Sequence, residues 1–186
     1  MNTLCICSKN EIYKIFQRKK YWIILTVTLG ITVCGALIGL ISNSIISFSS
    51  QNYPYVILSL CCYVFVPFTA LMLSSDLISS ECERNELRFL LTKHASRTEL
   101  LFGKLAAVIV YEFFLTAANV IAALIFSMIF SGFTSVNIFA VLMSVVITVI
   151  PIAAFVSFAG IISVFCKNGI SAFGMGVAAY GGFTLL

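Results

Sequence analysis

The residues that could carry chemistry are few and scattered. His94 is the only histidine of the chain, and Asp76 is the only aspartate. A metalloprotease needs several histidine or carboxylate ligands together, an aspartyl protease needs two aspartates, and a serine hydrolase in the membrane needs a histidine at that depth. Gly103-Lys104 lacks the upstream glycine and the following Ser or Thr of a phosphate-binding loop. We therefore expect no catalytic site here, and any energy from a nucleotide comes from a partner.

The cysteines form no recognisable metal or disulfide pattern. Cys5 and Cys7 have no histidine or third cysteine nearby, which argues against a zinc site. The others lie in apolar runs or in segments expected to face the cytoplasm, where disulfides are not favoured: Cys34, Cys61, Cys62, Cys82 and Cys166. We expect neither a metal nor a cofactor in this chain.

Glu112 is the one acidic residue inside an apolar run. A charge at the centre of a membrane helix costs about 2.5–3.5 kcal/mol on insertion scales, so such a residue is a candidate functional site. Residues 113–130 are also long enough to span the membrane alone, which would place Glu112 at the inner interface. The sequence leaves open whether Glu112 is an intramembrane polar site or an interfacial residue.

The composition is that of an integral membrane protein. Of the 186 residues, 61% are hydrophobic and 10% charged, whereas soluble domains have about 45–50% apolar and about 25% charged residues. This excludes a soluble enzyme, a nucleic-acid-binding domain and a disordered tail. We predict an all-α polytopic helical bundle, a single transmembrane domain over residues 1–186.

Five apolar runs predict five spans, at about 21–41, 55–73, 105–130, 138–164 and 170–186. Pro151 lies in the middle of the fourth run, which is too long for one upright span and therefore predicts a tilted or kinked helix. The last run has only 17 residues and no polar flank. We expect that a sixth span is missing from this chain.

Two amphipathic segments lie outside these runs. Residues 1–20 predict a helix on the membrane surface, capped by Ser8, although an ordinary charged flank remains an alternative. Its apolar face would carry Ile12, Ile15 and Phe16, with Glu11, Lys14 and Arg18 turned away. Residues 76–104 predict a second amphipathic helix, followed by a new helix that begins at a cap formed by Ser96 and Glu99.

All eleven basic residues fall in alternate segments. They lie in the N-terminal segment, in residues 76–104 and at Lys167, whereas the loops at 42–54 and 131–137 carry no charge. Because basic residues mark the cytoplasmic side, we predict a cytoplasmic N-terminus and a multi-pass protein of the plasma membrane.

The charged interior segment resembles the loop between the second and third spans of export-type ATP-binding-cassette permeases, the type-2 family. The matching residues are Glu83, Leu87, Leu90, Leu91, Ser96, Arg97, Gly103 and Lys104. Asn85 and Glu86 stand where that family has a Gly-Thr pair, and His94 stands where it has proline. The basic helix before the first span is similar to the elbow helix of the same family.

The resemblance implies a function and partners. It implies a permease subunit of a bacterial exporter that lines the translocation path with a second permease subunit, in a homo- or heterodimer. ATP and Mg²⁺ would be bound by a separate ATPase subunit, on which the loop docks as a coupling helix. The docking residues would be Glu81, Glu83, Arg84, Leu87, Leu90, Leu91 and Arg97. The alternative is a non-transporting membrane scaffold or assembly protein, and the substrate is not readable from the sequence.

Overall fold

The long apolar runs fold into helices, because the membrane interior offers backbone N–H and C=O groups no other partners. This computed structural model describes residues 3–41, 52–79, 97–131, 137–166 and 168–185, and every regular element in those ranges is a helix. Four helical stretches are long and apolar enough to cross a membrane: Lys19–Ile38, Tyr53–Ser79, Thr98–Ile129 and Ile138–Phe165. The predicted all-α polytopic membrane fold is confirmed.

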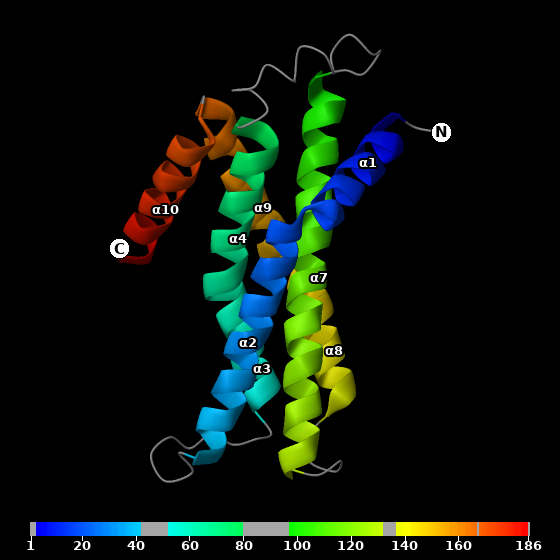
Figure 1. Cartoon of the computed structure of the whole chain (residues 1–186), viewed down its shortest axis with the longest axis vertical. Helices are drawn as coiled ribbons and strands as arrows, with labels where there is room; N and C mark the ends of the chain where they lie inside the picture. The colour runs from blue at the N-terminus through cyan, green and yellow to red at the C-terminus, as the bar shows by residue number, and fades with distance from the viewer. Residues whose placement is uncertain (1–2, 42–51, 80–96, 132–136, 167, 186) are drawn as a thin grey trace.

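The first two helices form an elbow (Figure 1). Helix α1 (Thr3–Gln17) is separated from α2 (Lys19–Ile41) by a break at Arg18. Tyr21 N–H still donates to the Arg18 carbonyl at 3.2 Å, so the break changes direction within one turn. Ser8 is not the cap that we predicted from the sequence, because α1 begins five residues before it.

The second rod contains α3 (Tyr53–Leu60), the π-helix η1 (Cys61–Phe65), α4 (Val66–Ser74) and a second π-helix, η2 (Ser75–Ser79). Pro67 is the second residue of α4, in its first turn and two positions after the end of η1. Since proline has no N–H to donate and its ring crowds the preceding turn, the wider π-helical turn relieves that crowding. The rod continues past the predicted end at residue 73, so Asp76 lies in helix.

Helix α7 (Arg97–Ser131) is the central element. It begins directly after the predicted cap residue Ser96, which lies outside the described residues, and it packs against α1, α2, α3, α4 and α9. Small residues allow the close approach of α7 and α9: Ala107 and Ala159 are fully buried. A Cβ atom on Gly160 would lie only 2.6 Å from Leu105 Cδ2.

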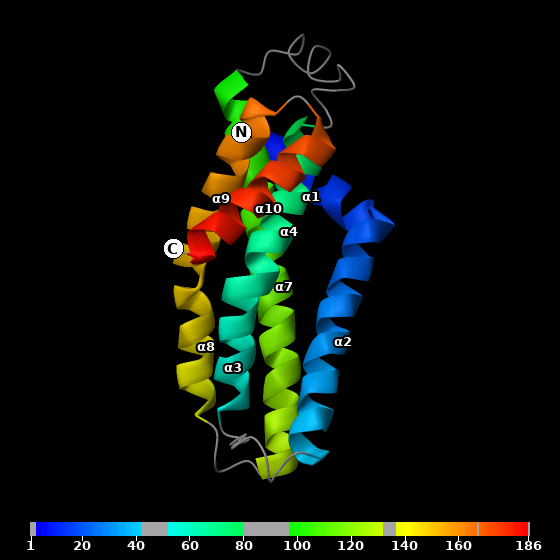
Figure 2. The ribbon, with the colours of Figure 1, turned by 90° about the vertical axis from the view of Figure 1, so that its left-hand side faces the viewer.

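The fourth rod is divided at Thr148 into α8 (Ile138–Ile147) and α9 (Val149–Phe165). The division lies three residues before Pro151, whose ring would clash with the carbonyl of Ile147 in a regular helix. Helix α10 (Gly169–Leu185) then crosses α4 and α9 obliquely (Figure 2). Its 17 residues reach about 26 Å, less than the about 30 Å of the hydrocarbon core. The five-span count and the span boundaries stay predictions.

The two ends of the bundle differ in charge. The end of the second rod (η2), the start of α7 and the start of α10 lie at one end, with the α1–α2 elbow in the same half, and the end of α2, the start of α3, the end of α7 and the start of α8 lie at the other (Figure 1). Every charged residue that the structure describes, except Glu112, belongs to the first end or to α1 beside it. This separation agrees with the predicted grouping of basic segments on one side of the membrane.

Candidate functional site

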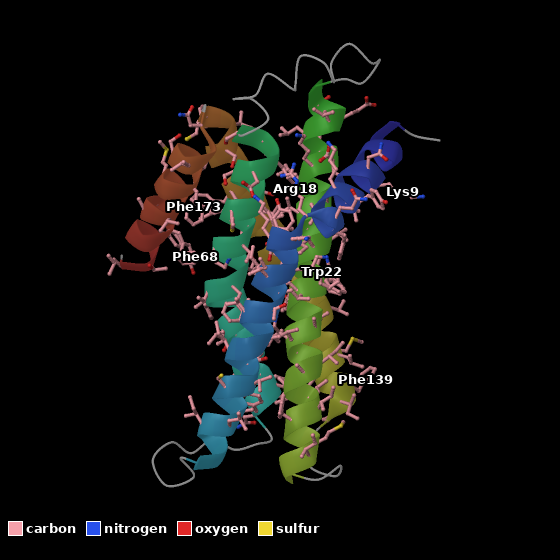
Figure 3. All side chains as sticks on the ribbon, viewed as in Figure 1. Lys9, Arg18, Trp22, Phe68, Phe139 and Phe173 are labelled. Carbon is pink, nitrogen blue, oxygen red and sulfur yellow. The ribbon has the colours of Figure 1, made fainter. Side chains whose placement is uncertain are left out.

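The elbow helix packs onto α7 with a face wider than the sequence indicated. Ile15 is 1% exposed, as predicted for the apolar face, but Glu11 is also buried, at 6%. Lys14 lies 3.0 Å from Glu11 Oε1 and compensates its charge. The prediction that Glu11 is turned away was therefore wrong, because α1 lies along α7 and buries one flank as well as its apolar stripe. Lys9 points away from the bundle (Figure 3).

An ion pair joins the start of α2 to the end of the second rod. The Lys20 ammonium and the Asp76 carboxylate form an ion pair. The Lys20 side chain is 38% exposed, and the Asp76 side chain is 24% exposed. The Tyr21 hydroxyl also donates to Asp76 Oδ2 at 3.2 Å, and the Lys20 ammonium lies 5.2 Å from the centre of the Tyr21 ring. The only aspartate of the chain thus fixes η2 to the elbow. We call Lys20, Tyr21 and Asp76 the elbow junction.

Two more contacts hold η2 from the opposite sides. Lys104 on α7 is 2% exposed, and its ammonium donates to the Leu77 carbonyl. The Ser79 hydroxyl donates to the Ser163 carbonyl of α9 at 2.8 Å. In the first contact η2 accepts through a backbone carbonyl, and in the second η2 donates through a side chain. The last described turn before residue 80 is therefore connected to α2, α7 and α9.

The elbow junction is also bonded to α7. Tyr111 donates its hydroxyl hydrogen to the Tyr21 carbonyl at 2.9 Å, and the two rings are tilted with centres 5.7 Å apart. Phe16 of α1 contacts the Tyr111 ring edge-on at 6.3 Å. These aromatic contacts place the bend between α1 and α2 against the middle turns of α7.

A second polar region lies on one face of α7. Glu112, Thr116 and Asn119 are all 0% exposed, and their spacing of four and three residues puts them on one side of the helix. Asn119 Nδ2 lies 3.2 Å from Thr28 Oγ1 of α2. Glu112 Oε2 lies 2.8 Å from Thr69 Oγ1 of α4. We call Glu112, Thr116 and Asn119 the α7 polar face.

The structure describes only part of the predicted site. The predicted docking residues Glu81, Glu83, Arg84, Leu87, Leu90 and Leu91 lie outside the described residues, and α7 begins at Arg97, whose side chain is not described. Glu112 lies near the middle of the apolar part of α7. Its side chain contacts Thr69 of α4, whereas the neighbouring Tyr111 contacts Tyr21 of the elbow junction.

Comparison with known proteins decides what kind of bundle this is. Residues 6–180 match the family of ABC-2 family transporter proteins, and the match covers nearly the whole chain. The chain belongs to the ABC-2 transporter family. This confirms the resemblance found in the charged loop, and the chain is a membrane permease of an ATP-binding-cassette transporter. No curated protein matches it.

Sequence reasoning missed the roles of several residues in this permease. The sequence places Lys20 in the basic N-terminal segment and Lys104 in the loop that resembles the permease family, but it does not indicate that these residues and Tyr21 make contacts that hold η2. Thr69 was not singled out at all. The only signal was indirect, since a single aspartate and a single intramembrane glutamate each need partners, and the sequence does not say which.

Proposed function

We propose that this permease is the membrane-spanning subunit of an exporter powered by a separate ATP-binding-cassette ATPase, on which residues 81–97 dock. ATP and Mg²⁺ would be bound by that ATPase, and a second permease subunit would complete the translocation path. The family match supports the transporter part of this proposal. The docking part rests on the chemistry of the segment and on what lies beside it.

The segment joins two helices that can carry a displacement into the membrane. Residues 81–97 begin just after η2, which ends at Ser79, and they end at Arg97, the first residue of α7. The preceding turn, η2, is bonded to α2 through Asp76, to α7 through the Leu77 carbonyl and to α9 through Ser79. A movement of residues 81–97 driven by the ATPase would therefore reach three membrane helices together. This arrangement is the observation that carries the proposal.

The docking surface itself is predicted from the sequence. Leu87, Leu90 and Leu91 have helical spacing and would form an apolar ridge. Burial of one leucine contributes about 1.5–3 kcal/mol, so loss of one ridge leucine costs about tenfold or more in affinity. Arg84 and Arg97 would set orientation more than affinity, because exposed ion pairs contribute about 0–1 kcal/mol.

The test is co-purification of the partner ATPase with the permease. We expect Leu90→Asp to remove the ATPase from the purified complex while membrane insertion is kept. The matched control is Asn85→Asp, which adds the same charge within the segment but leaves the leucine ridge intact, and it should retain the ATPase. If Leu90→Asp retains full binding and ATP-driven transport, residues 81–97 are not the coupling element. A permease that binds no ATPase in any form would favour the scaffold alternative.

A further inference from the structure

The hydroxyl of Thr69 lies between two oxygen atoms, and both are close enough for a hydrogen bond. Thr69 Oγ1 is 2.6 Å from the Phe65 carbonyl oxygen and 2.8 Å from Glu112 Oε2. A threonine hydroxyl has one hydrogen, which it can donate to only one of these acceptors. An ionised carboxylate is an acceptor only. The second short contact therefore needs a hydrogen that Glu112 supplies.

Within the described part of the chain, the surroundings of Glu112 offer nothing to balance a negative charge. Glu112 is 0% exposed, and its Oε1 has no hydrogen-bond partner among the residues that the structure describes. Among the described residues no Lys, Arg or His lies within ion-pair distance of it. The titratable groups that face it are the Cys61 thiol of η1 and the neighbouring Tyr111, and neither is a cation. An ionised carboxylate without a partner in such a place is strongly disfavoured.

We propose that Glu112 is a proton-binding site in the core of the bundle, where its carboxyl is held as the neutral acid. The Glu112 Oε2–H group donates to Thr69 Oγ1, and the Thr69 hydroxyl donates to the Phe65 carbonyl. This chain of two hydrogen bonds joins α7 to the end of η1, beside Pro67. It satisfies each short contact with one hydrogen and leaves no buried charge.

The site also has a consequence for movement of the helices. If the proton leaves, Thr69 has one hydrogen for two acceptors, and a carboxylate remains in an apolar contact. Loss of the proton therefore requires that α4 and α7 separate enough to admit water or a cation. This inference needs only a membrane-embedded bundle, so it stands or falls independently of docking to an ATPase.

The test is infrared spectroscopy of the purified full chain in lipid nanodiscs at neutral pH. We expect the wild type to show the C=O stretching band of a protonated carboxylic acid, with the small downshift on exchange into D₂O that marks such a group. Glu112→Gln should remove this band. The matched control is Glu11→Gln, which removes a buried glutamate that is paired with Lys14 and should leave the band unchanged.

A second variant keeps the carboxyl and changes only its partner. Thr69→Val removes the acceptor of the Glu112 hydrogen, so the band should persist and move to higher frequency. It also tests the proposal if Glu112→Gln fails to fold. If the wild type lacks the band, or if Glu112→Gln removes a carboxylate band instead, Glu112 is ionised and the proposal is wrong. An unshifted band in Thr69→Val would likewise contradict the hydrogen bond proposed here.

Discussion

Tyr180 of α10 donates its hydroxyl hydrogen to the carbonyl oxygen of Tyr63 at 2.5 Å. Pro67 stands four residues after Tyr63 and has no N–H to offer that carbonyl. In a bilayer an unsatisfied carbonyl is costly, and neighbouring helices commonly supply the missing donor. Helix α10 thus donates a hydrogen bond to a carbonyl that Pro67 cannot serve. Phe68 and Phe173 contact each other at 6.5 Å between the same two rods (Figure 3).

The first prediction concerns this hydrogen bond. Tyr180→Phe should destabilise the protein by about 1–3 kcal/mol, because the Tyr63 carbonyl loses its donor. Unfolding in detergent would measure the change. In a Pro67→Ala background the new N–H can bond to Tyr63, so the same substitution should cost much less. Tyr13→Phe, at a residue that is 65% exposed, is the control. Equal costs of Tyr180→Phe in both backgrounds would contradict this account.

The second prediction concerns the elbow junction. Asp76→Asn should lower ATP-driven transport severalfold while the ATPase still co-purifies, because η2 loses its ionic contact with α2. Its effect on folding should be small, about 1 kcal/mol or less, since both side chains of the pair are partly exposed.

A charge exchange distinguishes the pair from either residue alone. The double variant Lys20→Asp with Asp76→Lys restores opposite charges and should recover part of the transport that each single variant loses. Additive losses in the double variant would show that Lys20 and Asp76 act separately.

The third prediction is the orientation of the bundle. In a variant without native cysteines, Asn137→Cys at the start of α8 should react with an impermeant thiol reagent in intact cells. Lys9→Cys, at an exposed position of α1, should react only after the cells are opened. Both expectations follow from the basic residues at the α1 end. Labelling of residue 9 from outside would reverse the predicted topology.

Local features of the sequence were enough to establish the class of this protein and much of its layout. Hydropathy and the grouping of charge along the chain predicted a helical membrane bundle, an amphipathic helix ahead of the first span and a tilted or kinked fourth span around Pro151. The charged loop also indicated the transporter family. These features depend on neighbours in sequence, because helix periodicity, hydrophobic length and the lack of an N–H on proline are local properties.

The pairing of polar groups, in contrast, follows from how the helices pack. Asp76 bonds to Lys20 across 56 positions, Glu112 meets Thr69 across 43, and Tyr180 reaches Tyr63 across 117. Helical periodicity says which face a residue occupies, but it does not say which helix packs against that face or at what height. Each of these contacts depends on how whole helices pack, and in a bilayer that packing must satisfy every buried polar group at the same time.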